Sequence, residues 1–130
     1  MSGAAWAAAR DLVGTRFRLQ GRDPATGLDC IGVITAAYAA AGVRLAAIED
    51  YPLRGVPVER ALAVLANLPV ERVEGIGRAG DFGLYLLPAG QLHFAMIGAD
   101  RLVHADAALR RVVEAPLDRL PVPTGRWGVA

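Results

Sequence analysis

The stretch that decides the fold reads GLDCIGVITAAYAAAG and covers residues 27–42. Asp29 stands directly before a long apolar run, which is the position of an N-cap residue that accepts hydrogen bonds from free backbone N–H groups. The run that follows contains no charge, so it predicts a buried helix over residues 30–41. Gly42 favours the end of that helix. Cys30 is then the first residue of a buried helix.

The elements on either side of this helix divide into helices first and strands afterwards. Upstream, the pattern predicts a helix over residues 2–13 and a glycine-rich loop over 14–29. Downstream, it predicts a helix over 57–68 and then short strands over residues 70–73, 82–87, 92–97, 101–104 and 111–114. Turn residues at 88–90 and 98–100 favour antiparallel hairpins. This order is typical of an α+β domain.

Residues 43–56 carry no clear pattern, because Pro52 and Gly55 break any regular element there. The segment contains Tyr51 and Arg54, so two hypotheses remain open. It either folds over a cleft as a lid or forms an inert surface loop.

Composition excludes several classes of protein. The chain has 130 residues, which indicates one domain over residues 1–130. Its 14 basic and 13 acidic residues give a net charge of +1, which argues against a nucleic-acid binder. A single cysteine excludes an intrachain disulfide and zinc sites built on CxxC pairs. No secretory signal or membrane-inserting run is visible, so we expect a soluble protein made in the cytoplasm.

Three residues can form a nucleophilic site. The two histidines of the chain, His93 and His104, fall on neighbouring predicted strands, and Cys30 begins a helix. A helix N-terminus stabilises a thiolate, and an imidazole can take the thiol proton. A second polar group then orients that imidazole. A thiolate paired with His93 predicts alkylation of Cys30 at pH 6.

Alternation along residues 92–97 supports this arrangement. It places Leu92, Phe94 and Met96 on one face of the strand and His93 on the other, beside the small Ala95. The segment 101–104 follows a tight turn, so His104 is expected to lie across from His93.

Simpler interpretations of the same residues remain open. A lone cysteine in a buried helix is often a small core residue, and a strand histidine is often structural. Asp29 can be an N-cap and nothing more. Cys30, His93 and His104 can also be three zinc ligands with an open fourth position, although their spacing has no metal-site signature. We expect no metal and no cofactor.

Four motifs resemble those of one family, the NlpC cell-wall peptidases. GTRFRLQG at residues 14–21 with GLDCIG at 27–32 resembles the nucleophile motif of that family, and AGDF at 79–82 resembles its P-G-D motif. HFAMIG at 93–98 resembles its H-V-G-I-Y-L-G strand, and VHA at 103–105 resembles its I-H-A motif. The order and gaps match over about residues 10–105.

The resemblance implies a papain-like α+β fold, with N-terminal helices packed on a small antiparallel sheet. It implies that Cys30 is the nucleophile, His93 the base and His104 the orienting residue. The family cuts peptide stems of bacterial peptidoglycan, commonly at a D-glutamyl bond next to diaminopimelate. Peptidoglycan is therefore the implied substrate.

Three residues depart from the family pattern. Phe17 replaces the usual tyrosine, Ile31 follows the cysteine in place of serine, and Gln20 stands where many members have glycine. Gln20 and Ile31 together resemble a branch found in phage tails and gene-transfer particles of alphaproteobacteria. That branch implies phage-like tail proteins as partners and delivery of the chain to the periplasm by a particle.

The oxyanion and substrate-binding positions carried over are Gln20, Phe17 and Asp29. The backbone N–H of Cys30 and the Gln20 amide can both donate to an oxyanion, whereas Phe17 has no hydroxyl to do so. Two alternatives to a peptidase remain: a non-catalytic structural or peptide-binding tail component on the same fold, and a thiol acyltransferase or amidase.

Overall fold

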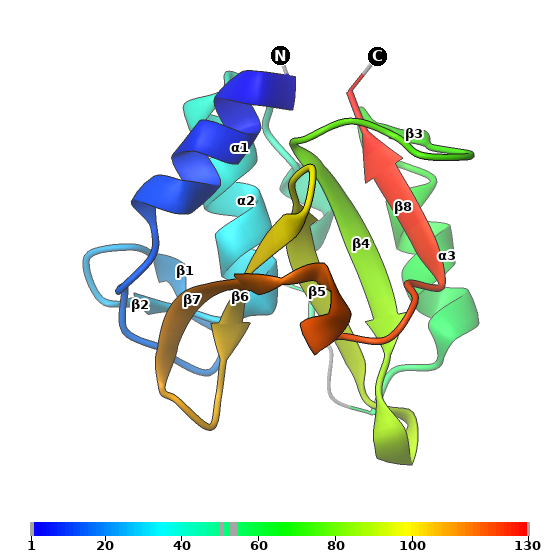
Figure 1. Cartoon of the computed structure of the whole chain (residues 1–130). Coiled ribbons are helices and arrows are strands. Elements are labelled where there is room, and N and C mark those ends of the chain that lie inside the picture. The colour runs from blue at the N-terminus through cyan, green and yellow to red at the C-terminus, as the bar shows by residue number, and fades with distance from the viewer. Residues whose placement is uncertain (1, 50, 53–54, 130) are drawn as a thin grey trace.

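The computed structural model describes residues 2–49, 51–52 and 55–129 of the chain. Its helices are α1 (Ser2–Asp11), α2 (Cys30–Ala40) and α3 (Val58–Leu65), and short 3₁₀ turns cover Ala46–Ile48, Pro88–Gly90 and Leu117–Arg119. Helices α1 and α2 pack against each other beside the sheet, as Figure 1 shows. The α+β class expected from the order of elements is confirmed.

The main sheet has six antiparallel strands in the order β3-β8-β4-β5-β6-β7. The strands are β3 (Glu71–Arg72), β4 (Asp81–Leu86), β5 (Leu92–Ile97), β6 (Arg101–Asp106), β7 (Arg111–Pro116) and β8 (Gly125–Gly128). The turns at 88–90 and 98–100 join β4 to β5 and β5 to β6 as hairpins, as their residues predict.

Helix α2 forms the centre of the core. The Asp29 carboxylate caps it by accepting a hydrogen bond from the Gly32 N–H at 2.9 Å. Gly42 follows its last turn with a φ of +88°, a conformation that glycine adopts without strain. Tyr38 is buried and its hydroxyl donates to the Gly80 carbonyl oxygen at 2.7 Å. The helix is thereby fixed against the start of β4.

The two faces of β5 bury different side chains, as the alternation predicts. Leu92, Phe94 and Met96 belong to the main core with α2. Ala95 lies on the opposite face in a smaller apolar cluster with Tyr85 and neighbouring residues of β6 and β7. His93 therefore lies on the face turned away from the bulky core residues.

The loop expected at residues 14–29 contains a small antiparallel hairpin, β1 (Arg22–Asp23) and β2 (Gly27–Leu28). The hairpin lies directly on the first turn of α2. A Cβ at Gly32 would clash with the Gly21 carbonyl oxygen, so only glycine permits this approach at position 32. Two residues per strand are too few to give an alternating pattern, and the sequence therefore indicated only a loop.

Strand β8 was also absent from the sequence expectations. It runs between β3 and β4 and pairs Trp127 with Phe82. The Trp127 and Phe82 rings stack at 5.9 Å, and Arg126 Nε donates to the buried Asp81 carboxylate at 2.7 Å. Glycines at both ends leave only two side chains on the strand, so its position depends on these long-range contacts.

The segment 43–56 is only partly described, and Arg54 lies outside the described residues. The described part includes the 3₁₀ turn Ala46–Ile48, and Tyr51 packs against the core. Tyr51 does not line the cavity discussed below, so the described part of the segment adds no contact in favour of a lid. None of the helices within the described ranges has the length and apolarity needed to cross a bilayer.

Candidate active site

The candidate site lies where strands β5 and β6 separate. These two strands pair at Met96 with Val103 and at Ile97 with Leu102, whereas the β6–β7 ladder continues over the whole of β6. Beyond Met96 the N-terminus of α2 approaches both strands. Cys30 from α2, His93 from β5 and His104 from β6 line one cavity of about 240 Å³ at this point.

The two histidines form a direct pair, with His93 Nε2 at 2.8 Å from His104 Nδ1 and the rings almost perpendicular. Neutral imidazole carries its proton on one nitrogen only. If His93 is to accept a thiol proton at Nδ1, its Nε2 must be protonated and must donate to His104 Nδ1. The contact is compatible with the orienting role predicted for His104, in which Nδ1 accepts this hydrogen bond.

His104 is held tightly in this position. It is only 5% exposed, and among the described residues its buried Nε2 atom has no hydrogen-bond partner. In the tautomer described above, that Nε2 carries a proton and points to no acceptor. Of the two ring nitrogens of His104, Nδ1 contacts His93 Nε2, and Nε2 has no partner among the described residues.

Burial favours the neutral form of both Cys30 and His93, which line the same cavity. Burial of the thiol raises the pKa of Cys30 to about 12, and the nearby Asp29 charge raises it further, while Arg22 and the backbone N–H groups of Phe94 and Ile31 oppose the shift. Burial lowers the pKa of His93 to about 4. This direction is opposite to the lowered thiol pKa that reactivity at pH 6 requires, because the helix N-terminus does not offset the loss of water around the sulfur.

Two charged residues, Asp106 and Arg119, also act on the pKa values of the histidines. Burial lowers the pKa of His104, and Asp106 opposes this shift while Arg119 adds to it. Asp106 also opposes the downward shift in the pKa of His93. A neutral imidazole in the same cavity as a neutral thiol can act as a general base once it comes within hydrogen-bond reach of that thiol.

All three predicted oxyanion and substrate-binding residues line the cavity, which Phe17, Gln20 and Asp29 share with Cys30. Gln20 adopts a left-handed backbone with φ of 60°. Glycine adopts this conformation without strain. Phe17 contributes an apolar side chain, and Asp29 is engaged as the N-cap of α2.

Sequence reasoning missed several residues of the cavity. Leu120, from the segment after β7, and Leu87, after β4, reach it from distant parts of the chain, as do Leu19 and the residues 105–107. Arg22 was also missed: its Nη1 binds Asp29 Oδ1 at 2.6 Å. A basic residue in a polar, glycine-rich loop has no signal that separates it from a solvated side chain.

The structure gives no support to the zinc alternative. Among the residues that it describes, no three His, Cys, Asp or Glu side chains are grouped to hold a metal ion. One nitrogen of each histidine is instead engaged in the contact between the two rings.

Comparison with known proteins identifies the class of fold. No family model matches the sequence, and no curated protein matches it. Among solved structures, the NlpC/p60 domain of the peptidoglycan hydrolase SagA is 21% identical, with a TM-score of 0.66 and 99% of each chain covered. NlpC2 from Trichomonas vaginalis is 16% identical, with a TM-score of 0.71, and the match covers 98% of this chain and 48% of that one.

A third similar structure is the P60 domain of an antigen from M. avium subspecies paratuberculosis. It is 20% identical, with a TM-score of 0.56, and the match covers 98% of this chain and 93% of that one. The chain thus has the papain-like fold of NlpC/p60 domains, as the sequence motifs predict.

Proposed function

We propose that this chain is a member of the NlpC/P60 family and a cysteine peptidase that hydrolyses peptide stems of bacterial peptidoglycan. Cys30 is the nucleophile, His93 the base and His104 the orienting residue. The observation that carries the proposal is their convergence on one cavity, with His93 Nε2 held at 2.8 Å from His104 Nδ1. The similarity to a domain of a peptidoglycan hydrolase supports the substrate class.

In the proposed reaction, His93 Nδ1 accepts the thiol proton as the Cys30 sulfur attacks the carbonyl carbon of the scissile amide. The C–N bond then breaks, and His93 gives the proton to the leaving amine. A thioester on Cys30 remains, and water attacks it while His93 accepts a proton from that water. The acid product leaves and Cys30 regains its proton. Because both groups are neutral at rest, proton transfer accompanies the attack on the carbonyl.

The tetrahedral oxyanion needs donors close to Cys30. The Cys30 backbone N–H lies in the first turn of α2, where helical N–H groups have no partner within the helix. The Gln20 amide, on the cavity wall, is the second donor in this proposal. Losing one such donor typically lowers turnover by about 100- to 1000-fold. Because Phe17 supplies no hydroxyl, Gln20 takes on this role in the proposed site.

The proposal extends to where the protein acts. We place it in a phage-tail or gene-transfer particle that brings it to the peptidoglycan from the periplasmic side, with phage-like tail proteins as its partners. The support is the resemblance of Gln20 and Ile31 to that branch of the family. Isolating particles from the producing cells and probing them with an antibody against this chain tests this part by itself; a chain found only in the cytoplasm contradicts it.

Digestion of purified peptidoglycan tests the enzymatic proposal. Wild-type protein should release fragments with one new amine and one new carboxyl end, and Cys30→Ala should release none. Mass spectrometry of the products identifies the cleaved bond and the stereochemistry on both sides. Wild-type protein that binds the peptides without cleaving them would favour the binding-module alternative. Product formed only when an acceptor amine is added would favour an acyltransferase.

A further inference from the structure

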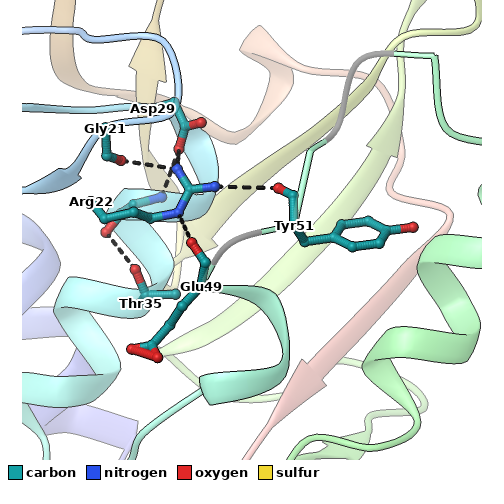
Figure 2. A network of polar contacts seen from close by, with 7 residues as sticks. Gly21, Arg22, Asp29, Thr35, Glu49 and Tyr51 are labelled. Atoms are coloured by element: carbon teal, nitrogen blue, oxygen red, sulfur yellow. Dashed lines mark hydrogen bonds and ion pairs between the residues drawn. The ribbon is translucent and has the colours of Figure 1, made fainter.

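Arg22, on strand β1, connects three separate parts of the chain beside the nucleophile helix, as Figure 2 shows. Its Nη1 donates to Asp29 Oδ1 at 2.6 Å and to the Gly21 carbonyl oxygen at 3.0 Å. Its Nε and Nη2 donate to the carbonyl oxygens of Glu49 and Tyr51, at 2.5 and 3.3 Å. One planar guanidinium therefore links the β1–β2 hairpin, the N-cap of α2 and the segment around Glu49.

The ion pair at the centre of this network is largely shielded from water. The side chains of Arg22 and Asp29 are 19% and 12% exposed. The Asp29 oxygen that binds Arg22 also accepts the hydrogen bond from the Gly32 N–H. The same carboxylate thus caps the helix and balances the guanidinium charge. Without Arg22, a partly buried carboxylate would stand one residue from the Cys30 thiol and would oppose its ionisation.

We propose that Arg22 is a positioning residue of the site: its guanidinium neutralises Asp29 next to the nucleophile and holds the described part of the segment around Glu49 against the start of α2. The inference rests on the proposed function only in calling Cys30 the nucleophile of a hydrolysis. The role of Arg22 is tested through the reactivity of the thiol, which can be measured without hydrolysis. Geometry carries it, since all four hydrogen bonds of the guanidinium reach acceptors within these three parts.

The charges around the sulfur agree with this role. The Asp29 charge raises the pKa of the Cys30 thiol, and the Arg22 charge lowers it. From the sheet, His93, His104 and Asp106 line the same cavity. Burial holds the pKa of both histidines below its usual value, so they are neutral near pH 7. Replacing either Asp29 or Arg22 therefore changes the net charge that acts on the Cys30 thiol.

Alkylation of Cys30 measures this balance directly, because the chain contains no other cysteine. The probe is iodoacetamide, which is uncharged and so insensitive to the net charge of the cavity. Second-order rate constants at fixed pH between about 7 and 9.5 are compared for wild type, Arg22→Met, Asp29→Asn and the double variant. Asparagine caps helices as well as aspartate, so Asp29→Asn removes charge and keeps the cap.

Arg22→Met should slow alkylation about 3- to 10-fold, because the thiolate fraction falls while the higher pKa makes that thiolate more nucleophilic. Asp29→Asn should react at least as fast as wild type. The double variant should return close to the wild-type rate, since neither charge is then present. Arg22→Met equal to wild type, or a double variant as slow as Arg22→Met, would overturn the proposal.

Arg44 offers a matched control. It pairs with the Glu49 carboxylate at 2.9 Å, but its side chain is 77% exposed. Arg44→Met removes the same charge near the same segment and should leave the alkylation rate unchanged. Hydrogen exchange gives the second readout: the amides of Ile48 and Glu49 should exchange faster in Arg22→Met and at the wild-type rate in Arg44→Met. Unchanged exchange in Arg22→Met would contradict the tie to this segment.

A folding defect does not prevent the test. Arg22→Gln keeps an amide donor without the charge, so it should fold where Arg22→Met does not, and it should still slow alkylation. A wild-type rate for Arg22→Gln overturns the electrostatic role. If peptidoglycan is not cleaved by wild type while the alkylation rates follow the predicted pattern, the proposed function fails and the role of Arg22 stands.

Discussion

Substitution of His104 distinguishes an orienting residue from a bystander, because one atom of the ring makes the contact. Nδ1 lies at 2.8 Å from His93 Nε2, whereas no residue that the structure describes pairs with the buried Nε2. Nδ1 is bonded to Cγ of the histidine, and Oδ1 of asparagine is likewise bonded to Cγ. His104→Asn therefore places an acceptor close to the position of Nδ1 and removes the unpaired Nε2. Glutamine places its acceptor one carbon farther away.

The expected magnitudes follow from the hydrogen bond that is lost. His93 is positively charged in the transition state, and a hydrogen bond to a charged group contributes about 1.5 to 3 kcal/mol. His104→Ala should therefore lower turnover by about 10- to 150-fold. His104→Asn should keep turnover within about tenfold of wild type, since the acceptor is retained. His104→Gln should resemble alanine.

Initial rates with saturating peptidoglycan peptide, measured for all three variants, check these values. Thermal unfolding of each variant shows whether the fold is kept. Equal losses in His104→Asn and His104→Ala would refute the argument from Nδ1. If both variants matched wild type, His104 would be a bystander, and Asp106, which lines the same cavity, would be the next candidate for the orienting residue.

Four further outcomes are expected. Cys30→Ala should abolish cleavage of peptidoglycan while its melting temperature stays within a few degrees of wild type, because little volume is lost. As the pH falls from about 6.5 toward 4, the unfolded chain binds a proton at His93 that the folded chain does not, since the folded pKa is about 4. Denaturant unfolding should therefore show decreasing stability over that range, and a flat profile would contradict a buried neutral imidazole. Gln20→Gly removes the amide donor, so turnover should fall about 100-fold, and it relieves the left-handed backbone, so the melting temperature should not fall and should rise by up to a few degrees. Gly32→Ala should lower the melting temperature, because its Cβ would clash with a backbone carbonyl, whereas Gly3→Ala, with open space around it, should not.

The sequence predicted those parts of the fold whose pattern lies within one element. Asp29 caps α2 as expected, because an N-cap and the apolar run that follows it are neighbours in the chain. Alternation in β5 placed His93 opposite Phe94 for the same reason. The convergence of Cys30, His93 and His104 on one cavity depended on the family resemblance, because spacing alone does not bring a helix start to the gap between two strands.

The features that were missed depend on distant contacts. Trp127 and Arg126 fix strand β8 against β4. The sequence around these two residues has no local pattern that predicts a strand. Arg22 binds the backbone carbonyl oxygens of Glu49 and Tyr51. Every residue has such an oxygen, so residue identity does not predict which of them Arg22 contacts. The upward direction of the shift in the Cys30 pKa was not predicted, because a sequence gives the helix N-terminus but not the depth of burial around the sulfur.

The energetics of the cavity bear on the choice between the proposed catalytic role and a purely structural one. His104 Nε2 is buried and has no partner within the described part of the chain, and a buried polar atom left unpaired costs about 1 to 3 kcal/mol of stability. Gln20 adds a left-handed backbone, at a further cost of about 1 to 2 kcal/mol. Apolar residues in place of the histidines could extend the neighbouring cluster of Tyr85 and Ala95 and would avoid the first cost. A surface that only binds peptide has no use for two contacting imidazoles in the cavity that also contains the thiol, whereas the proposed acyl transfer uses all three groups.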